Sequence, residues 1–275
     1  EFSAANQKRI DEILKNGSLE EVTILEKKYK SMANKNNIID ELSNVIGIGS
    51  AIATDLINKY DIRSLDDLIN KVNTKVINVN DKIKLGLKYI GKFETKIPRK
   101  IVKTIYNLIV TKINKLNSNI TITICGSYRR GLPQSSDIDI LVCDLDILFK
   151  DQMKSATTIN KVVTTLKKEN LITDDITSSS VSSKYMGFCN FENKLYRIDI
   201  RLVPVESYFA AILYFTGSYQ LNIKLRLLAK KLGYKLNEYG LFKNNFKEFI
   251  PINSESDIFD LLNFNYLEPE QRNIN

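Results

Sequence analysis

The sequence of 275 residues predicts an α+β protein with a helical N-terminal part, a mixed β-sheet with flanking helices, and a small α+β module at its C-terminal end. Three observations predict this fold class. Apolar residues recur at helical spacing through the first third of the chain. From Ile120 onward, short stretches alternate strictly between apolar and polar residues, as half-buried strands do. After Pro204 helical spacing returns, and a mixed pattern follows it.

The first part of the chain is predicted to consist of short helices. Gln7–Leu14 has apolar residues at helical spacing, and the helix stop Asn16-Gly17 follows it. The polar stretch Asn34–Asn37 is expected to be a linker. Helical spacing resumes over Ile38–Leu68, where Gly47-Ile48-Gly49 interrupts it with a turn.

The middle of the chain is predicted to hold strands. Pro98 interrupts a basic stretch and is expected to mark the boundary before them. Alternating patterns predict strands at Ile120–Ile124, Asp137–Val142 and Arg197–Leu202. Helical spacing predicts helices at Thr157–Asn170, Glu206–Leu213 and Leu221–Leu232.

The composition excludes several kinds of chemistry. The chain has no histidine, which rules out Ser-His-Asp triads, histidine zinc ligands and histidine general bases. Its three cysteines, Cys125, Cys143 and Cys189, form neither a disulfide framework nor a CxxC pattern, so we expect an intracellular protein of the nucleus or cytoplasm. No apolar run approaches the ~18 residues of a membrane span, so no membrane partner is expected.

The net charge of +8 is unevenly distributed. Residues 1–118 carry 21 Lys and Arg against 14 Asp and Glu, a balance of +7, whereas the remainder has a balance of only +1. This asymmetry indicates a polyanionic partner for the N-terminal part. A lysine-rich surface that keeps the protein soluble explains the charge equally well.

Three aspartates form the main candidate site. Residues two apart on a strand point the same way, so Asp137 and Asp139 share one face, and Asp199 is flanked by apolar neighbours in the same manner. Carboxylates gathered in this way suit Mg²⁺. An Asp-x-Asp pattern alone is more often a solvated strand face. The neighbouring Gly126-Ser127, Arg129-Arg130-Gly131 and Ser135-Ser136, however, supply groups that bind phosphate oxygens.

These motifs resemble the nucleotidyltransferase signature of the family X DNA polymerases, whose reference member is DNA polymerase beta. The resemblance rests first on Gly126–Gly131 followed by Asp137-Ile138-Asp139. It continues, in the family's order, through Leu87-Lys88-Tyr89, Lys96–Arg99, Arg197–Pro204, Tyr214–Ser218, Asn237–Leu241, Asp257–Asp260 and Tyr266–Pro269. It therefore covers nearly the whole chain.

The resemblance implies a role for each matching residue. Asp137 and Asp139 would bind two Mg²⁺ ions, for which Mn²⁺ can substitute. Asp199 would bind the catalytic ion and accept the proton of the primer 3′-hydroxyl, and an ion pair with Arg197 would keep it ionised. The nucleotide-binding residues implied are Gly126, Ser127, Arg130, Ser135, Ser136, Tyr214, Phe215, Gly217, Tyr219 and Asn222. The DNA-binding residues implied are Gly47, Gly49, Lys184, Arg197, Arg201, Arg226 and Tyr239.

The resemblance also implies a domain order. Residues 1–33 would be a remnant or truncated lyase-like helical segment, 34–98 a helix-hairpin-helix DNA-binding module, 99–205 the catalytic palm and 206–275 a nucleotide-selecting thumb-like domain. In this family the hairpin carbonyls hold a monovalent cation, Na⁺ or K⁺, which points to Ser43, Val45 and Ile48.

The sequence departs from the family pattern at three places. Ser136 stands where a glycine is usual, and Tyr219 replaces a small acidic residue near the incoming base. Arg9 stands where the family's Schiff-base lysine is expected, and an arginine cannot form an imine. We therefore expect no deoxyribose-phosphate lyase activity, and borohydride trapping of an adduct at Lys8 would overturn this expectation.

The sequence thus predicts a template-directed DNA polymerase that fills short gaps in repair, without proofreading. Its partners would be gapped or primed duplex DNA and dNTPs, and it would act as a monomer. Two alternatives remain, a template-independent nucleotidyltransferase and a catalytically silent DNA-binding scaffold.

Overall fold

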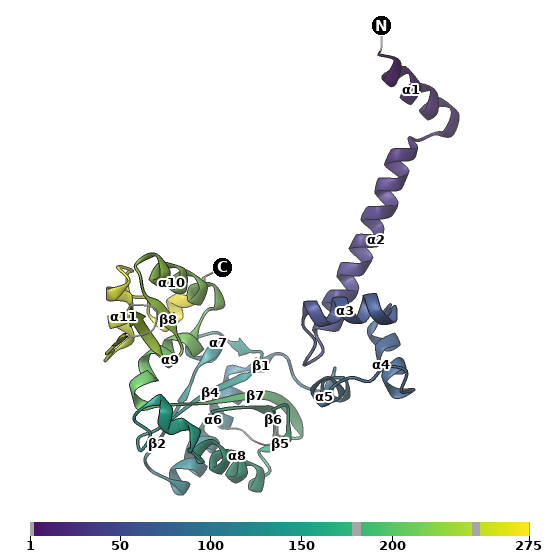
Figure 1. The fold of residues 1–275 in the computed structure, drawn as a ribbon. Helices are drawn as coiled ribbons and strands as arrows, with labels where there is room; N and C mark the ends of the chain where they lie inside the picture. The colour runs from purple at the N-terminus through teal and green to yellow at the C-terminus, as the bar shows by residue number, and fades with distance from the viewer. Residues whose placement is uncertain (1–2, 178–182, 244–247, 275) are drawn as a thin grey trace. The chain divides into compact units, whose positions relative to one another are not determined.

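The computed structural model describes residues 3–177, 183–243 and 248–274, and the chain divides into two compact units, residues 1–90 and 91–275 (Figure 1). Each unit has its own hydrophobic core. Within the described residues, no helix combines the length and apolar character that a membrane span requires.

The first unit is helical throughout. Its helices are α1 (Ala4–Asn16), α2 (Glu20–Ser43), α3 (Ser50–Tyr60), α4 (Leu65–Asn73) and α5 (Asp81–Tyr89). The predicted stop after α1 is confirmed, because Gly17 caps the helix in the left-handed conformation with φ of 75°.

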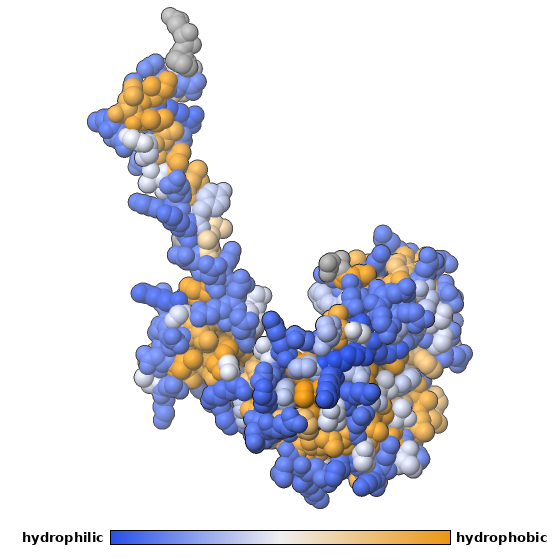
Figure 2. All heavy atoms as spheres, turned by 180° about the vertical axis from the view of Figure 1, so that it is seen from behind, coloured by the Kyte–Doolittle hydropathy of each residue, from blue (hydrophilic) through white to orange (hydrophobic). Residues whose placement is uncertain are grey.

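The linker predicted at Asn34–Asn37 is wrong, because these residues lie inside α2. Helix α2 continues through them to Leu42, which is completely buried in the core of the first unit. Asparagine lowers helix propensity only slightly, and packing of the next turns outweighs that cost. Helix α1, in contrast, buries no side chain, and its Leu14 is 80% exposed. Figure 2 shows hydrophobic side chains on the surface of this N-terminal end of the chain.

The second unit is built around a mixed five-stranded sheet of order β2-β4-β7-β6-β5. The strands are β2 (Ile120–Ile124), β4 (Ile138–Asp144), β5 (Ile172–Asp175), β6 (Lys184–Phe191) and β7 (Lys194–Val203). Only β4 and β7 pair in parallel within this sheet. The three strands expected from alternation are confirmed as β2, β4 and β7.

Helices α6 (Arg99–Leu116) and α8 (Thr158–Lys168) supply apolar side chains to the core of this sheet. The sheet contributes Ile138, Ile140, Ile198 and Ile200 to the same core. Because successive strand residues point to opposite faces, the aspartates between these isoleucines are turned away from the helices. Packing of the apolar face therefore decides where the carboxylates lie.

The boundary expected at Pro98 lies earlier in the chain. Pro98 belongs to β1 (Ile97–Pro98), which pairs with β3 (Gln134–Ser135) in the second unit, whereas the two units divide between Ile90 and Gly91. Pro98 also directly precedes α6, the first helix of the second unit, and a proline is well tolerated at the start of a helix.

The C-terminal part of the second unit forms a smaller α+β layer with a core of its own. A 3₁₀ turn at Val205–Ser207 precedes α9, so the helix predicted from Glu206 begins two residues later. The elements are α9 (Tyr208–Thr216), α10 (Tyr219–Lys231), β8 (Lys235–Asn237), β9 (Gly240–Lys243), β10 (Glu248–Ile250), α11 (Glu255–Leu261) and the 3₁₀ turn η4 (Pro269–Arg272).

Candidate active site

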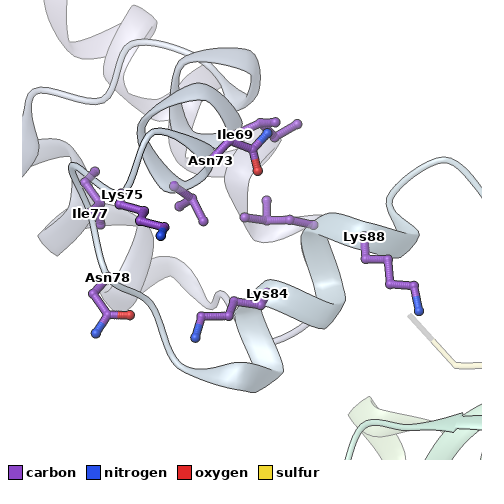
Figure 3. A pocket seen from close by; sticks show the side chains of 9 residues that line it. Ile69, Asn73, Lys75, Ile77, Asn78, Lys84 and Lys88 are labelled. Carbon is purple, nitrogen blue, oxygen red and sulfur yellow. The ribbon is translucent and has the colours of Figure 1, made fainter.

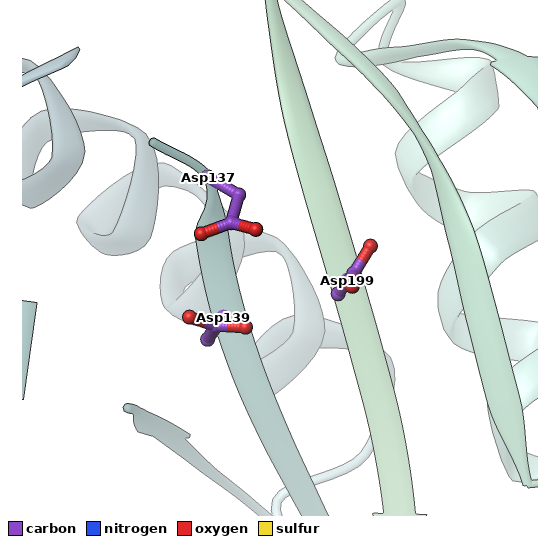
Figure 4. A group of neighbouring side chains, drawn as sticks. All are labelled: Asp137, Asp139 and Asp199. Atoms are coloured by element: carbon purple, nitrogen blue, oxygen red, sulfur yellow. The ribbon is translucent and has the colours of Figure 1, made fainter. Parts of the chain in front are cut away.

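Asp137, Asp139 and Asp199 come together at the centre of the sheet (Figure 4). Asp139 and Asp199 are direct partners in the parallel pairing of β4 with β7, and Asp137 directly precedes β4. One ligand oxygen from each of the three carboxylates lies within 4.8 Å of the other two. Three clustered oxygen donors without nitrogen or sulfur fit a hard cation such as Mg²⁺.

The electrostatics of the triad show how much the carboxylates repel one another. Burial, together with the charges of Asp137 and Asp199, raises the pKa of Asp139 to about 8. Burial also raises the pKa of Asp199, although the charge of Arg197 opposes the shift. A divalent cation between these groups would relieve the repulsion and favour their ionised forms.

This crowding predicts a pH dependence of stability in the absence of metal. The folded state binds the Asp139 proton more tightly than the unfolded chain, whose carboxyl pKa is near 3.8, so stability falls as the pH rises from about 4 through about 8. Asp139→Asn should remove this fall and, at pH 8 in EDTA, exceed the unaltered chain by at least about 1 kcal/mol. Urea unfolding at several pH values measures this. Asp151→Asn, at an exposed carboxylate, is the control, and an unchanged pH profile for Asp139→Asn would contradict the assignment.

Arg197 lies beside the triad. Its Nη2 is 3.5 Å from Asp199 Oδ2 and 3.8 Å from Asp137 Oδ2, so the ion pair expected with Asp199 is present. Its buried Nε has no hydrogen-bond partner within the described structure. Arg197 therefore faces the carboxylates, and the DNA contact expected of it stays a prediction.

The short helix α7 (Gly126–Arg129), which follows β2, approaches the triad closely at Gly126. Gly126 has φ of +56°, and a Cβ built there would lie 1.9 Å from Asp139 Oδ2. Only glycine meets both demands. On the same helix, Ser127 Oγ donates a hydrogen bond to the Oγ of buried Ser135 over 2.8 Å.

The triad opens into a cavity of about 400 Å³. Nine of the predicted nucleotide-binding residues line it: Gly126, Ser127, Arg130, Ser136, Tyr214, Phe215, Gly217, Tyr219 and Asn222. The tenth, Ser135, contacts Ser127 from behind. Tyr219 is 75% exposed and therefore presents its ring to an incoming molecule.

Arg130 is held by the C-terminal end of the described chain. Its Nη1 donates to the carbonyl of Thr216 over 2.6 Å, and its Nε donates to Asn273 Oδ1 over 2.9 Å. Asn273 Nδ2 donates in turn to the carbonyl of Arg130 over 3.0 Å. Neither Thr216 nor Asn273 was predicted, because nothing in their local sequence indicates contact with a loop 86 or 143 residues away.

A buried charge network lies behind this loop and was also missed. Glu255, at the start of α11, accepts from Arg129 over 2.5 Å and from Arg272 over 2.5 Å. Arg129 also donates to Thr216 Oγ1 over 2.7 Å. The tandem Arg129-Arg130 was the available signal, since one arginine of the pair faces the cavity and the other faces this network.

The remaining predicted DNA contacts of the second unit lie around the cavity. Arg201 lines it, and Lys184 is the cross-strand partner of Arg201 on β6. Arg226 lies over the Tyr214 ring at 4.7 Å and 3.6 Å from Glu238 Oε2. Tyr239 lies outside the cavity, beneath the Lys150 ammonium at 3.8 Å.

The predicted hairpin residues lie in the first unit, between α2 and α3. Gly47 has φ of +94°, and Gly49 precedes the first residue of α3. The side chains of Val45 and Ile48 are buried, and Ile48 N donates to the carbonyl of Val45 over 3.0 Å. The chain therefore turns sharply here. Cation binding by the carbonyls of Ser43, Val45 and Ile48 stays a prediction.

Two family models match the second unit. Residues 96–205 match the DNA polymerase beta palm, and residues 211–273 match the DNA polymerase beta thumb. The palm and the thumb were expected at residues 99–205 and 206–275.

Similar proteins and structures extend over most of the chain. DNA polymerase lambda of Arabidopsis thaliana is 30% identical over 98% of this chain and 52% of its own length. The DNA-directed DNA/RNA polymerase mu of Homo sapiens is 26% identical over 99% of this chain and 58% of its own length. The chain thus spans about half the length of the curated relatives it matches.

Among solved structures, the ternary P/T complex of Leishmania infantum polymerase beta is 30% identical, with a TM-score of 0.77, over 88% of this chain and 100% of that one. The ternary gap complex of the same protein is 28% identical, with a TM-score of 0.79, over 88% of this chain and 91% of that one.

Proposed function

The chain belongs to the family X DNA polymerases, and from this premise we propose that it adds deoxynucleotides to a primer 3′-hydroxyl under the direction of a template, filling short gaps during DNA repair. The observation that carries this proposal is the triad of Asp137, Asp139 and Asp199 in a cavity that Ser127 and Arg130 also line. Such a site can hold metal ions, a triphosphate and a primer end together.

The three carboxylates have different tasks in this reaction. Asp137 and Asp139 would hold both Mg²⁺ ions, with Mn²⁺ as a substitute, and Asp199 would hold one of them and accept the proton of the 3′-hydroxyl. The bound ions supply charge stabilisation for the in-line displacement. Arg197 orients Asp199 and opposes the rise in its pKa, which keeps the carboxylate ready to accept a proton.

The cavity wall supports binding of a nucleoside triphosphate. Ser127 and Arg130 lie where they can bind phosphate oxygens, and burial lowers the pKa of Arg130 while Asp139 and Asp137 oppose this. Tyr214 and Phe215 form an edge-to-face pair with ring centroids 4.9 Å apart, against which the sugar packs. Asn222 follows on α10 and donates to the carbonyl of Tyr214 over 2.8 Å.

The DNA would be held without sequence preference. Glycines at the hairpin of the first unit allow backbone N–H groups to meet a phosphate, and a Na⁺ or K⁺ ion would bind nearby. Lys184, Arg201 and Arg226 contact the strands near the cavity. We propose that the protein acts as an intracellular monomer, in the nucleus or cytoplasm, where its three buried free thiols stay reduced.

Removing the Asn273 side chain is expected to weaken triphosphate binding. Asn273→Ala removes one of the two hydrogen-bond partners that hold the Arg130 guanidinium. The KM for dNTP should therefore rise about threefold to tenfold, as expected for the loss of one hydrogen bond. The kcat should change less than about twofold. Steady-state kinetics on a gapped duplex measures both constants. Lys231→Ala, an exposed position on the same layer, is the control, and an unchanged KM for Asn273→Ala would contradict this role.

The proposal is tested by dNTP incorporation on a one-nucleotide gapped duplex, compared with the same duplex lacking the template base. Template-matched extension supports the proposed function. Equal extension without the template base would indicate a template-independent nucleotidyltransferase. DNA binding without any incorporation would indicate a non-catalytic scaffold.

A further inference from the structure

A cavity of about 830 Å³ lies in the first unit, between α4, α5 and the segment that joins them (Figure 3). Its volume is within the range of small-molecule sites. Aliphatic side chains that are buried or half-buried form part of its lining: Ile69, Val72, Ile77 and Leu87. The exposed part of the lining carries amino and carboxamide groups instead.

The exposed part of this lining is positively charged. Lys75, Lys84 and Lys88 are exposed there, and none of the nine residues that line the cavity is acidic. Lys84 lies 3.1 Å from Asp81, but the Asp81 side chain is fully exposed, so water screens that pair. Residues 69–90 contain five lysines against this one carboxylate. The cavity is therefore suited to an anion that also has an apolar part.

Lys75 is held in an unfavourable backbone conformation at this site. It directly follows the C-cap of α4 with φ of +59°, in the left-handed region where glycine or asparagine is usual. Among the described residues, its ammonium group takes part in no salt bridge or hydrogen bond. A strained residue with an unused charge at the edge of a cavity indicates a binding role more than a structural one.

We propose that this cavity binds an unpaired nucleotide of single-stranded DNA, with the base on the aliphatic side chains and the flanking phosphates at Lys75 and Lys84. Single-strand binding sites combine a positively charged surface along the phosphates with side chains, mostly aromatic, against which bases pack; here aliphatic side chains would take that second part. The carboxamides of Asn73 and Asn78 offer both donors and acceptors, as base edges do. The inference rests on the proposed function in one respect, the choice of DNA as the anionic ligand. The cavity itself lies in the first unit, whereas the aspartates of the candidate active site lie in the second.

Binding of a fluorescently labelled thymidine tetranucleotide to the full chain tests the proposal. EDTA is present to remove divalent cations, so that metal-dependent nucleotide binding at Asp137, Asp139 and Asp199 does not contribute to the measured affinity. The double variant Lys75→Gln/Lys84→Gln should bind at least about fivefold more weakly. Its salt slope should be shallower by about 1.4, because each of the two lysines that neutralises a single-strand phosphate contributes ~0.7. Lys28→Gln/Lys30→Gln on α2 removes the same charge from exposed positions outside the cavity and should bind as the unaltered chain does.

Two further measurements separate binding from charge and from folding. An abasic tetranucleotide should bind the unaltered chain more weakly than the thymidine one, because it lacks a base for the aliphatic side chains. Lys75→Gly should raise the urea midpoint, since glycine accepts the left-handed conformation, while it weakens binding. A purely structural Lys75 would not produce these opposite changes.

Several results would overturn the proposal. The first is that the two double variants bind the tetranucleotide equally weakly. The second is that the unaltered chain binds the abasic and the thymidine oligonucleotides equally well. The third is that the chain binds a glutamate-rich peptide in place of DNA, with the same dependence on Lys75 and Lys84. Gap filling is assayed separately on all variants. A chain that binds the tetranucleotide through these lysines but incorporates no dNTP would contradict the proposed polymerase function and still support this binding site.

Discussion

Asp199→Ala is expected to reduce template-directed incorporation by about a thousandfold, within the ~10² to 10⁴ that a positioned general base contributes. The change removes both a metal ligand and the group placed to accept the primer proton. It leaves Asp137 and Asp139 on the other strand. Single-nucleotide incorporation on a gapped duplex, at saturating Mg²⁺ and dNTP, measures the effect.

The same variant should not be less stable when metal is absent. Asp199 is half-buried beside two other carboxylates, and desolvation raises its pKa, so its removal relieves repulsion in EDTA. A midpoint of urea unfolding at or above that of the unaltered chain therefore shows that the fall in activity does not come from unfolding. Asp151→Ala, at an exposed carboxylate, should change neither property. Retention of more than about a tenth of the activity by Asp199→Ala would remove Asp199 from the catalytic step.

Glu255→Gln is expected to have the largest effect on stability, a loss of about 3 kcal/mol or more. Glu255 is 8% exposed and lies between Arg129 and Arg272, of which the latter is completely buried. Neutralising the carboxylate leaves two guanidinium groups facing each other in a place that water hardly reaches. Because Arg129 adjoins Arg130, which lines the cavity of the triad, incorporation should fall as well.

Urea unfolding at pH 7 measures this loss. Glu169→Gln is the matched control, because Glu169 lies 2.6 Å from the Lys112 ammonium but is 41% exposed. Exposed ion pairs contribute about 0–1 kcal/mol, so the free energy of unfolding of the control variant should fall by no more than about 1 kcal/mol. Similar losses for both variants would mean that burial does not govern the strength of the Glu255 network.

The sequence predicted the elements of the site better than their assembly. Alternation placed Asp137, Asp139 and Asp199 on polar strand faces, because each carboxylate stands beside isoleucines that must be buried. Periodicity could not show that β4 and β7 pair in parallel, since that pairing depends on how the chain between the two strands folds. The strand pattern suggested that the three carboxylates gather, and the motif resemblance gave each of them a role.

Features that depend on distant contacts were missed. The Arg129–Glu255–Arg272 network joins residues 126 and 17 positions apart, and each charge by itself is typical of a surface. The linker expected at Asn34–Asn37 failed for a related reason. Local polarity suggested a loop, whereas burial of Leu42 beyond it keeps the helix continuous.

The parallel pairing of β4 with β7 has a consequence for how this protein can change over evolutionary time. Asp139 and Asp199 lie side by side because they are direct partners in this pairing, so gain or loss of one residue inside either strand would turn a carboxylate into the hydrophobic core. Between the two strands, α8, β5 and β6 are held by the same sheet and core, whereas the connections between these elements have no such register to keep. Lineages of this protein should therefore accumulate length differences in those connections and almost none within residues 138–144, 184–191 or 194–203.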